Sequence, residues 1–358
     1  MPDINLDLAV LEKLTQAPGL PGREAPVADV IAAALPPDWN LQRDPLGNLV
    51  ARRGEGQAAG AGSLGRSGPR VLLVAHMDEV GLVVRRITPQ GFLRVERLGG
   101  MGVRAMPGSH LTLWTERGSR TAQVGLPPAH LDKGGPLELE QIFIDIGARS
   151  KAEAEGWGVQ VGDGLTWHGP FERFGESCVR SKALDDRLGC FALLELARVL
   201  EKTACDLCLG FVVQEETMLQ GGLPVAQALQ PELVIGVDGT LAFDTPDLEG
   251  AQSDIRLGGG PALKLMDAIR GKSAAFVPDW ELTQSIRRSA ARAGIPLQAE
   301  VVTGISTAVT PLPYALGGLR TAALSLPVRY HHSAIETADL GDVGQLVRLL
   351  QAIVGDSF

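Results

Sequence analysis

Apolar residues recur along this chain with two different periods, and together these periods predict an α/β protein. In residues 8–34 the apolar positions follow helical spacing, which the Pro- and Gly-rich segment 18–22 interrupts. This spacing predicts a short helix, a turn, and a second helix that begins near Glu24. Residues 71–75 are instead a continuous apolar run, which is typical of a strand covered on both faces.

The same alternation of helices and buried strands continues in the second half of the chain. Apolar periodicity predicts buried strands at 209–213 and 233–237, and helices at 186–200, 224–229 and 339–354. Near the N-terminus, the segment 44–48 predicts a tight turn into a strand that begins at Leu49.

Between about residues 84 and 172 the pattern changes to short alternating runs that are separated by Gly and Pro clusters. This pattern indicates a small antiparallel β module, inserted into an α/β domain made of residues 1–83 and 173–358. Residues 54–69 are rich in Gly, Ala and Ser, and we expect a surface loop without a chemical role.

Composition and charge limit the classes of function. The 358 residues are enough for two domains, and 33 basic against 42 acidic residues give a net charge of −9, which argues against binding to nucleic acid. No apolar stretch reaches the ~20 residues of a membrane-spanning helix. The acidic N-terminus lacks the basic start of a secretory signal, and only four cysteines are present. We therefore expect a cytoplasmic protein without a membrane partner.

The candidate chemistry lies where apolar runs stop. His76, the pair Glu215 and Glu216, and Asp238 each follow a predicted buried strand. Since ligands of α/β sheets bind beyond the carboxyl ends of the strands, these side chains are expected to meet. Imidazoles and carboxylates held together can bind a pair of divalent cations, which indicates hydrolysis by metal-activated water.

Each of these residues also has a purely structural interpretation. A single histidine after an apolar run is usually structural, but Asp78 lies two positions after His76 and could accept a hydrogen bond from its second ring nitrogen. Asp185 and Asp186 open a predicted helix, and their structural interpretation is that they merely cap it. We expect instead that Asp185 bridges two cations and that Asp186 caps the helix or supports the site.

The adjacent acids Glu215 and Glu216 form the sharpest signal. Burying both is costly unless they are paired or bound to metal, although a solvated pair at a loop mouth is the alternative. Consecutive strand residues face opposite ways, so the backbone must turn there if both serve one site. One Glu could then bind a cation while the other takes a proton from the attacking water.

The two remaining candidates are weaker when each is taken alone. Asp238 could simply form a turn, and the pair His331 and His332 could lie on the surface. Of the six histidines, three lie in the inserted module, which leaves His332 as the natural second imidazole.

Taken together, these segments resemble the M42 family of metallo-aminopeptidases, which includes TET and glutamyl aminopeptidases. The resemblance extends over nearly the whole chain and rests on the order and spacing of residues 19–24, 44–48, 75–79, 143–148, 182–187, 214–216, 244–246, 260–267 and 327–333.

The resemblance implies a role for each candidate residue. His76 and Asp238 look like ligands of one metal ion, and Glu216 and His332 look like ligands of the other. Asp185 resembles the bridging carboxylate between the two ions. Glu215 looks like the general base and Asp78 like the acid that orients His76, and the two divalent ions would be zinc or cobalt.

The same resemblance implies the architecture and the partners. The expected fold is a three-layer α/β/α catalytic domain with a mixed, mostly parallel sheet and an inserted small β-barrel. The expected substrates are peptides, which lose residues from the free N-terminus. The expected assembly is a dimer that can build a hollow dodecamer.

The chain departs from the family pattern at a few positions that flank the candidate site. Relatives commonly carry Gly-Thr-Asp-Ala where residues 304–308 contain no acid, residues 217–221 differ after the paired glutamates, and His331 replaces a usual aliphatic residue. These departures keep two alternatives open. One is a related amide hydrolase such as a deacylase or deblocking peptidase; the other is an inactive peptide-binding protein. An endoglucanase activity fits less well, because two imidazoles beside the carboxylates favour metal.

Overall fold

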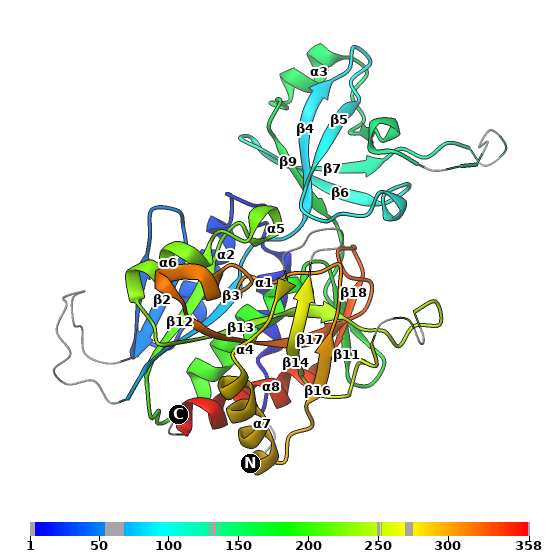
Figure 1. Cartoon of the computed structure of the whole chain (residues 1–358). Coiled ribbons are helices and arrows are strands. Elements are labelled where there is room, and N and C mark those ends of the chain that lie inside the picture. The colour runs from blue at the N-terminus through cyan, green and yellow to red at the C-terminus, as the bar shows by residue number, and fades with distance from the viewer. Residues whose placement is uncertain are drawn as a thin grey trace.

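The computed structural model consists of a large α/β domain and a small β-barrel above it (Figure 1). It describes residues 4–53, 68–128, 130, 134–135, 137–248, 251, 253–268 and 275–356. The predicted loop 54–69 lies almost entirely outside these residues. Within the part that is described, no helix combines the length and the apolar character needed to span a bilayer.

A nine-stranded mixed sheet forms the centre of the large domain. Its strands follow the order β1-β2-β12-β3-β13-β17-β14-β15, and β16 pairs with β14. The central pairings, β12 with β3, β3 with β13 and β13 with β17, are parallel. The strands are β1 (Trp39–Arg43), β2 (Leu49–Arg53), β3 (Arg70–His76), β12 (Asp206–Val212), β13 (Leu233–Leu241), β14 (Ala262–Ala268), β15 (Ala275–Phe276), β16 (Gln298–Val301) and β17 (Arg320–Val328).

Alternating residues of the central strands supply two separate apolar cores. On β3, Val71 and Leu73 pack into the core on one face, whereas Leu72 and Val74 pack into the core on the other. Because successive strand side chains point to opposite faces, an unbroken apolar run is what a sheet covered on both faces requires.

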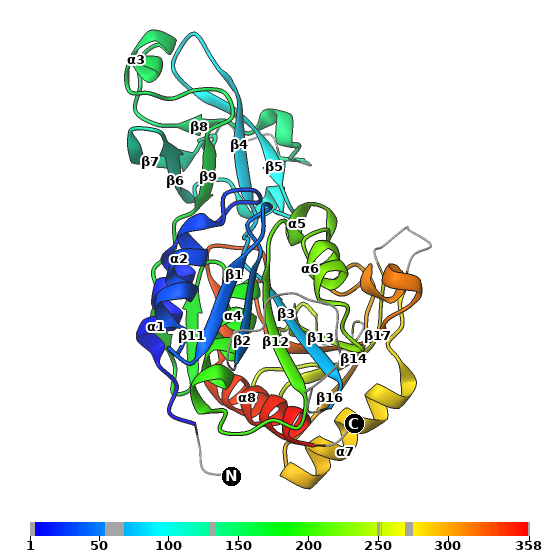
Figure 2. The same cartoon turned by 90° about the vertical axis from the view of Figure 1, so that its left-hand side faces the viewer.

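Helices cover both faces of the sheet, so the large domain has three layers (Figure 2). One core includes residues of α1 (Leu8–Gln16), α2 (Ala25–Ala34), α4 (Leu184–Val199), α7 (Trp280–Ala293) and α8 (Leu340–Gly355). The other includes residues of α6 (Gly222–Leu229) and the 3-10 helix η3 (Leu312–Gly317). The short helix α5 (Glu215–Met218) follows β12 in the chain.

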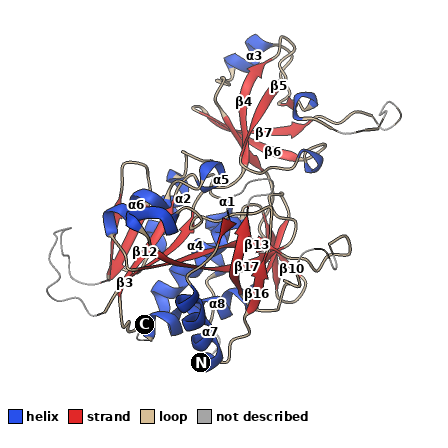
Figure 3. Cartoon of the chain, in the orientation of Figure 1, coloured by secondary structure: helices blue, strands red, loops and turns tan. Residues whose placement is uncertain are grey.

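The inserted module is a closed antiparallel barrel with strand order β4-β5-β8-β7-β6-β9 and its own apolar core (Figure 3). Its elements are β4 (Gly81–Ile87), β5 (Leu93–Leu98), η1 (Val103–Ala105), β6 (His110–Thr115), β7 (Gly118–Val124), η2 (Leu139–Gln141), β8 (Ile144–Asp145), α3 (Lys151–Gly156) and β9 (Gly164–Trp167). A small sheet of β10 (Glu172–Phe174), β11 (Cys178–Ser181) and β18 (Glu336–Asp339) follows order β10-β11-β18.

These observations confirm the predicted fold class and most of the predicted elements. The two N-terminal helices, the turn before Leu49 and the buried strand at 71–75 are all present. One strand is longer than predicted, because β13 continues past Val237 to Leu241 while it still pairs with β17. The barrel strands run from Gly81 to Trp167, and the domain limits at 84 and 172 stay a prediction.

Removing the side chain of Leu73 should test how far the domain depends on its central strand. Leu73 is fully buried on β3, so Leu73→Ala should lower the free energy of unfolding by about 2–5 kcal/mol through lost burial and a residual cavity. Urea unfolding monitored by circular dichroism measures this change. Leu46→Ala, at a side chain that is 50% exposed, is the control and should change little. A similar loss in both variants would contradict this account of the core.

Candidate metal centre

The candidate residues come from five separate segments and meet at the carboxyl ends of the parallel strands. His76 is the last residue of β3, and Asp185 lies in the first turn of α4. Glu215 and Glu216 open α5, which begins after a left-handed Gln214 (φ 57°), so the backbone turns as expected and both acids face one region.

Two further candidates are Asp238, which lies on β13, and His332, which lies in the loop between β17 and β18. Strand β13 pairs with β3 only as far as Gly236 and Val74, although its pairing with β17 continues. The separation of β13 from β3 beyond Gly236 opens the space in which Asp238 faces His76.

His76 is buried and lies among three carboxylates. Its Nε2 atom is 3.5 Å from Asp185 Oδ1, 3.7 Å from Asp238 Oδ1 and 3.9 Å from Glu215 Oε2. These separations exceed those of good hydrogen bonds and leave room between the groups for a bound ion.

His332 occupies the other side of Asp185. Its Nε2 atom is 3.1 Å from Asp185 Oδ2 and 3.3 Å from Glu216 Oε1. Asp185 therefore lies between the two imidazoles of His76 and His332, as a bridging carboxylate would.

Asp78 lies beside His76 and also contacts the paired glutamates. The Nδ1 atom of His76 lies 3.2 Å from the main-chain oxygen of Asp78 and 3.5 Å from its Oδ1. The Asp78 carboxylate also accepts backbone N–H bonds from Glu215 and Glu216, each at 3.0 Å. Asp78 thus holds the backbone of both glutamates beside His76.

Asp186 both caps the helix and supports His76, as one of the sequence interpretations required. One of its carboxylate oxygens accepts the N–H of Gly189, at 2.8 Å, and the other accepts the N–H of His76, at 3.0 Å. Its side chain therefore ties the start of α4 to the end of β3.

Glu336 and His331 are the residues at the site that the sequence analysis did not select. Buried Glu336 accepts the N–H of His332 at 2.7 Å and the N–H of Asp185 at 3.0 Å, so it positions two candidate ligands through their backbones. His331 lies with its Nε2 atom 3.0 Å from Asp185 Oδ2. The sequence offered no clear signal for Glu336, because residues 337–339 that follow it are not an apolar run.

A buried ion pair links the segment that follows His76 to the segment that precedes Asp185. The Lys182 ammonium donates to both carboxylate oxygens of Glu79 at 2.8 Å, and Arg187 lies 3.5 Å from the same carboxylate. All three side chains are nearly inaccessible to solvent. This pair, together with the Arg187 guanidinium, fixes the relative position of the two segments.

Burial and mutual repulsion shift the pKa values of the clustered groups. Burial raises the pKa of Asp238 to about 8, and burial also raises the pKa of Glu215 well above its ordinary value. For His76, burial alone would lower the pKa, but the Glu215 and Asp185 carboxylates outweigh it and raise the pKa. Burial lowers the pKa of His331 to about 4, so this imidazole is neutral at neutral pH.

The donor atoms are suited to divalent cations. Three overlapping groups have their ligand atoms within 4.8 Å of one another: His76, Asp185 and Asp238; His76, Glu215 and Glu216; and Asp185, His331 and His332. Among the residues that the structure describes, the buried atoms Asp185 Oδ1 and Glu216 Oε1 have no hydrogen-bond partner. Buried acceptors without donors are costly, and cations bound between them would satisfy both.

The barrel forms part of the wall of the site. A Cβ atom at Gly99 would come within 3.1 Å of Glu216 Oε2, and one at Gly100 within 2.7 Å of His332 Nδ1. In addition, the indole N–H of Trp167 donates to the main-chain oxygen of His332 at 3.1 Å. The inserted module therefore contacts the candidate ligands directly.

Comparison with known proteins agrees with this fold and shows the family of the chain. The model of the family described as M42 glutamyl aminopeptidase matches residues 58–349. The protein SgcX of Escherichia coli (strain K12) is 37% identical over 97% of this chain and 93% of its own. The chain therefore belongs to the M42 aminopeptidase family and is a peptidase, an enzyme that hydrolyses peptide bonds.

Solved structures show the same relationship. The aminopeptidase APDkam598 from the archaeon Desulfurococcus kamchatkensis superposes with a TM-score of 0.90 at 31% identity, covering 97% of this chain and 94% of the other. The TET1 peptidase of Pyrococcus horikoshii, described as able to assemble into a tetrahedron or a large octahedral shell, gives a TM-score of 0.84 at 30% identity, covering 98% and 99% of the two chains.

The loop that carries the two adjacent histidines is held by an ion pair whose loss can be measured. Arg329 donates to both oxygens of Asp244, each at 2.7 Å, and this pair lowers the pKa of Asp244 against the effect of burial. Asp244→Asn should lower the free energy of unfolding by about 1–2 kcal/mol at neutral pH.

The pH dependence of this difference has a definite sign. Because the folded pKa of Asp244 is depressed, its contribution is present above 3.8, its ordinary pKa, and is lost as the pH falls through the lowered folded value. Urea unfolding of the wild type and the variant over a pH series measures this. The exposed Asp247→Asn serves as the control. A difference that grows on acidification would contradict the assignment.

Proposed function

We propose that this protein is a di-metal-dependent aminopeptidase that removes residues from the N-termini of peptides. The observation that supports this most is the convergence of His76, Asp185, Glu215, Glu216, Asp238 and His332 around buried oxygens that lack hydrogen-bond partners. Membership of the M42 family supplies the reaction class, and the site chemistry supplies the proposed cofactors.

The residues fit two divalent cations, zinc or cobalt. His76 and Asp238 would hold one ion, Glu216 and His332 would hold the other, and Asp185 would lie between them. Nitrogen and carboxylate donors together suit such borderline metals better than calcium or magnesium. Bound there, the cations would lower the pKa of a water molecule and polarise the scissile carbonyl group.

Glu215 is the proposed general base. It is buried beside His76, and burial raises the pKa of Glu215 well above that of an ordinary glutamate, which makes this carboxylate a better proton acceptor. Glu215 would accept the proton of the attacking water and deliver it to the leaving amine. Asp78, which accepts the backbone N–H of Glu215, would keep this carboxylate in place.

Peptide substrates and self-association complete the proposal. The barrel loop at Gly99 and Gly100 lies against Glu216 and His332, so the module would limit how a peptide approaches the site. The related TET1 peptidase assembles into closed shells, and we infer that this chain also self-associates.

Replacing Glu215 tests the proposed base. Glu215→Gln keeps the size of the side chain but removes its proton acceptor, so kcat should fall by about 10²–10⁴-fold while the fold is retained. Release of a chromophore from aminoacyl reporter substrates measures the rate, with Glu12→Gln on the exposed surface of α1 as the control. Full activity of Glu215→Gln would exclude this residue as the base.

Metal removal and substrate choice test the rest of the proposal. Chelation should abolish hydrolysis, and adding back zinc or cobalt should restore it. The enzyme should cleave peptides with free N-termini but not their acetylated counterparts. Cleavage of acetylated peptides alone would instead identify a deblocking enzyme, and activity that survives complete metal removal would overturn the di-metal mechanism.

A further inference from the structure

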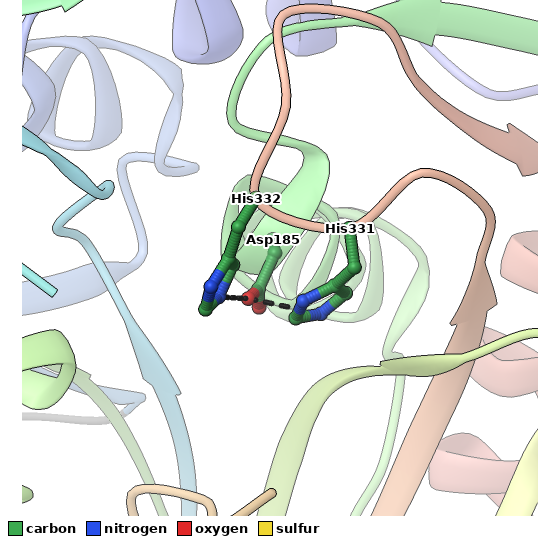
Figure 4. Close-up of side chains that lie close together, drawn as sticks. All are labelled: Asp185, His331 and His332. Carbon is green, nitrogen blue, oxygen red and sulfur yellow. Dashed lines mark hydrogen bonds and ion pairs between the residues drawn. The ribbon is translucent and has the colours of Figure 1, made fainter. Parts of the chain in front are cut away.

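His331 is the one imidazole in the described site to which no role has yet been given. It precedes His332 in the loop between β17 and β18, and the two rings lie with their centroids 4.4 Å apart and their planes tilted by 34°. Figure 4 shows the two rings on either side of Asp185, with one nitrogen of each ring directed at its carboxylate.

Two nitrogen atoms from adjacent residues approach the same oxygen. His331 Nε2 lies 3.0 Å from Asp185 Oδ2, and His332 Nε2 lies 3.1 Å from that same atom. Only the second contact has the geometry of a hydrogen bond, so the buried Nε2 atom of His331 has no hydrogen-bond partner among the described residues. A buried nitrogen without such a partner, close to a carboxylate oxygen, is suited to bind a cation together with that oxygen.

The neighbouring strand leaves space for this arrangement. A Cβ atom at Gly239 of β13 would lie 2.9 Å from Asp185 Oδ1 and 3.2 Å from His331 Nε2. Any side chain at this position would therefore press on both groups. Because position 239 is a glycine, the backbone of β13 lies close to Asp185 and His331 without a side chain that would press on them.

We propose that His331 is a ligand of the cation held by Asp185 and His332. The three residues form a group whose donor atoms lie within 4.8 Å of one another, and this group shares only Asp185 with one of the two groups that contain His76. This inference rests on the proposed di-metal function and assigns one more protein ligand to one of its two ions.

A second imidazole changes the chemistry of that ion site. With His331 and His332 both bound, the ion has two nitrogen donors, which favour zinc, cobalt and nickel over manganese and magnesium. The extra ligand also fills a coordination position that water would otherwise occupy. The two ions should consequently differ in affinity and in metal preference, and the difference should depend on His331.

A cysteine in place of His331 provides a spectroscopic test. The four native cysteines lie outside the groups that could hold metal. If position 331 ligates the ion, cobalt-loaded His331→Cys should show a sulfur-to-cobalt charge-transfer band that the wild type lacks. The matched control is His168→Cys, since His168 is exposed at the end of the barrel and should give no band.

A second variant measures the affinity for zinc. His331→Leu removes the donor but keeps much of the volume, so one of the two zinc ions should bind at least about tenfold more weakly, as judged by calorimetric titration. The other ion should bind as in the wild type. The loss of affinity caused by His331→Leu should be smaller for manganese than for zinc, because manganese gains less from a nitrogen ligand.

The outcomes separate this inference from the proposed function. If the wild type binds two ions, but His331→Cys shows no band and His331→Leu keeps the affinity of both ions, His331 is not a ligand and the di-metal proposal stands. If the wild type binds no divalent ion, the di-metal proposal itself fails, and the assignment of His331 fails with it.

Discussion

The crowding of buried acids at the carboxyl edge of the central parallel strands is the constraint on which the rest of this molecule depends. Asp185, Asp238 and Glu215 lie within 4 Å of the single imidazole of His76, in a region that water barely reaches. Like charges at this spacing repel, and burial adds a desolvation cost. Positive charge between the groups would offset both costs, and the two divalent cations proposed above would supply it.

Much of the surrounding structure holds these side chains against their repulsion. Carboxylates that do not face the open centre accept backbone N–H bonds: Asp78 from the glutamates of α5, Asp186 from His76, and Glu336 from Asp185 and His332. These contacts connect segments far apart in the sequence. Four of the five candidate ligands, His76, Asp185, Glu216 and His332, are therefore fixed through their backbones, which is the preorganisation that a metal site requires.

The barrel contributes to the same centre from outside the large domain. Trp167 at the end of the barrel donates to the main chain of His332, and glycines at positions 99 and 100 allow a barrel loop to approach Glu216 and His332 closely. The inserted module thus takes part in the candidate centre. It completes one wall of the centre and would limit which substrates reach it.

The sequence by itself determined the class of fold and most of the centre, because both leave local signals. Unbroken apolar runs identified the strands buried on both faces, and polar residues directly after them identified His76, Glu215 and Glu216. The extension of β13 beyond Val237 was missed, because it depends on pairing with β17, and pairing partners lie far away in the chain.

Only the tertiary structure decided how the donors are grouped. Whether Asp78 binds a ring or a backbone, and whether Glu336 and His331 belong to the centre, depends on distances between segments more than a hundred residues apart. Local patterns carry no information about such distances, since these arise only when the sheet, the helices and the barrel pack together.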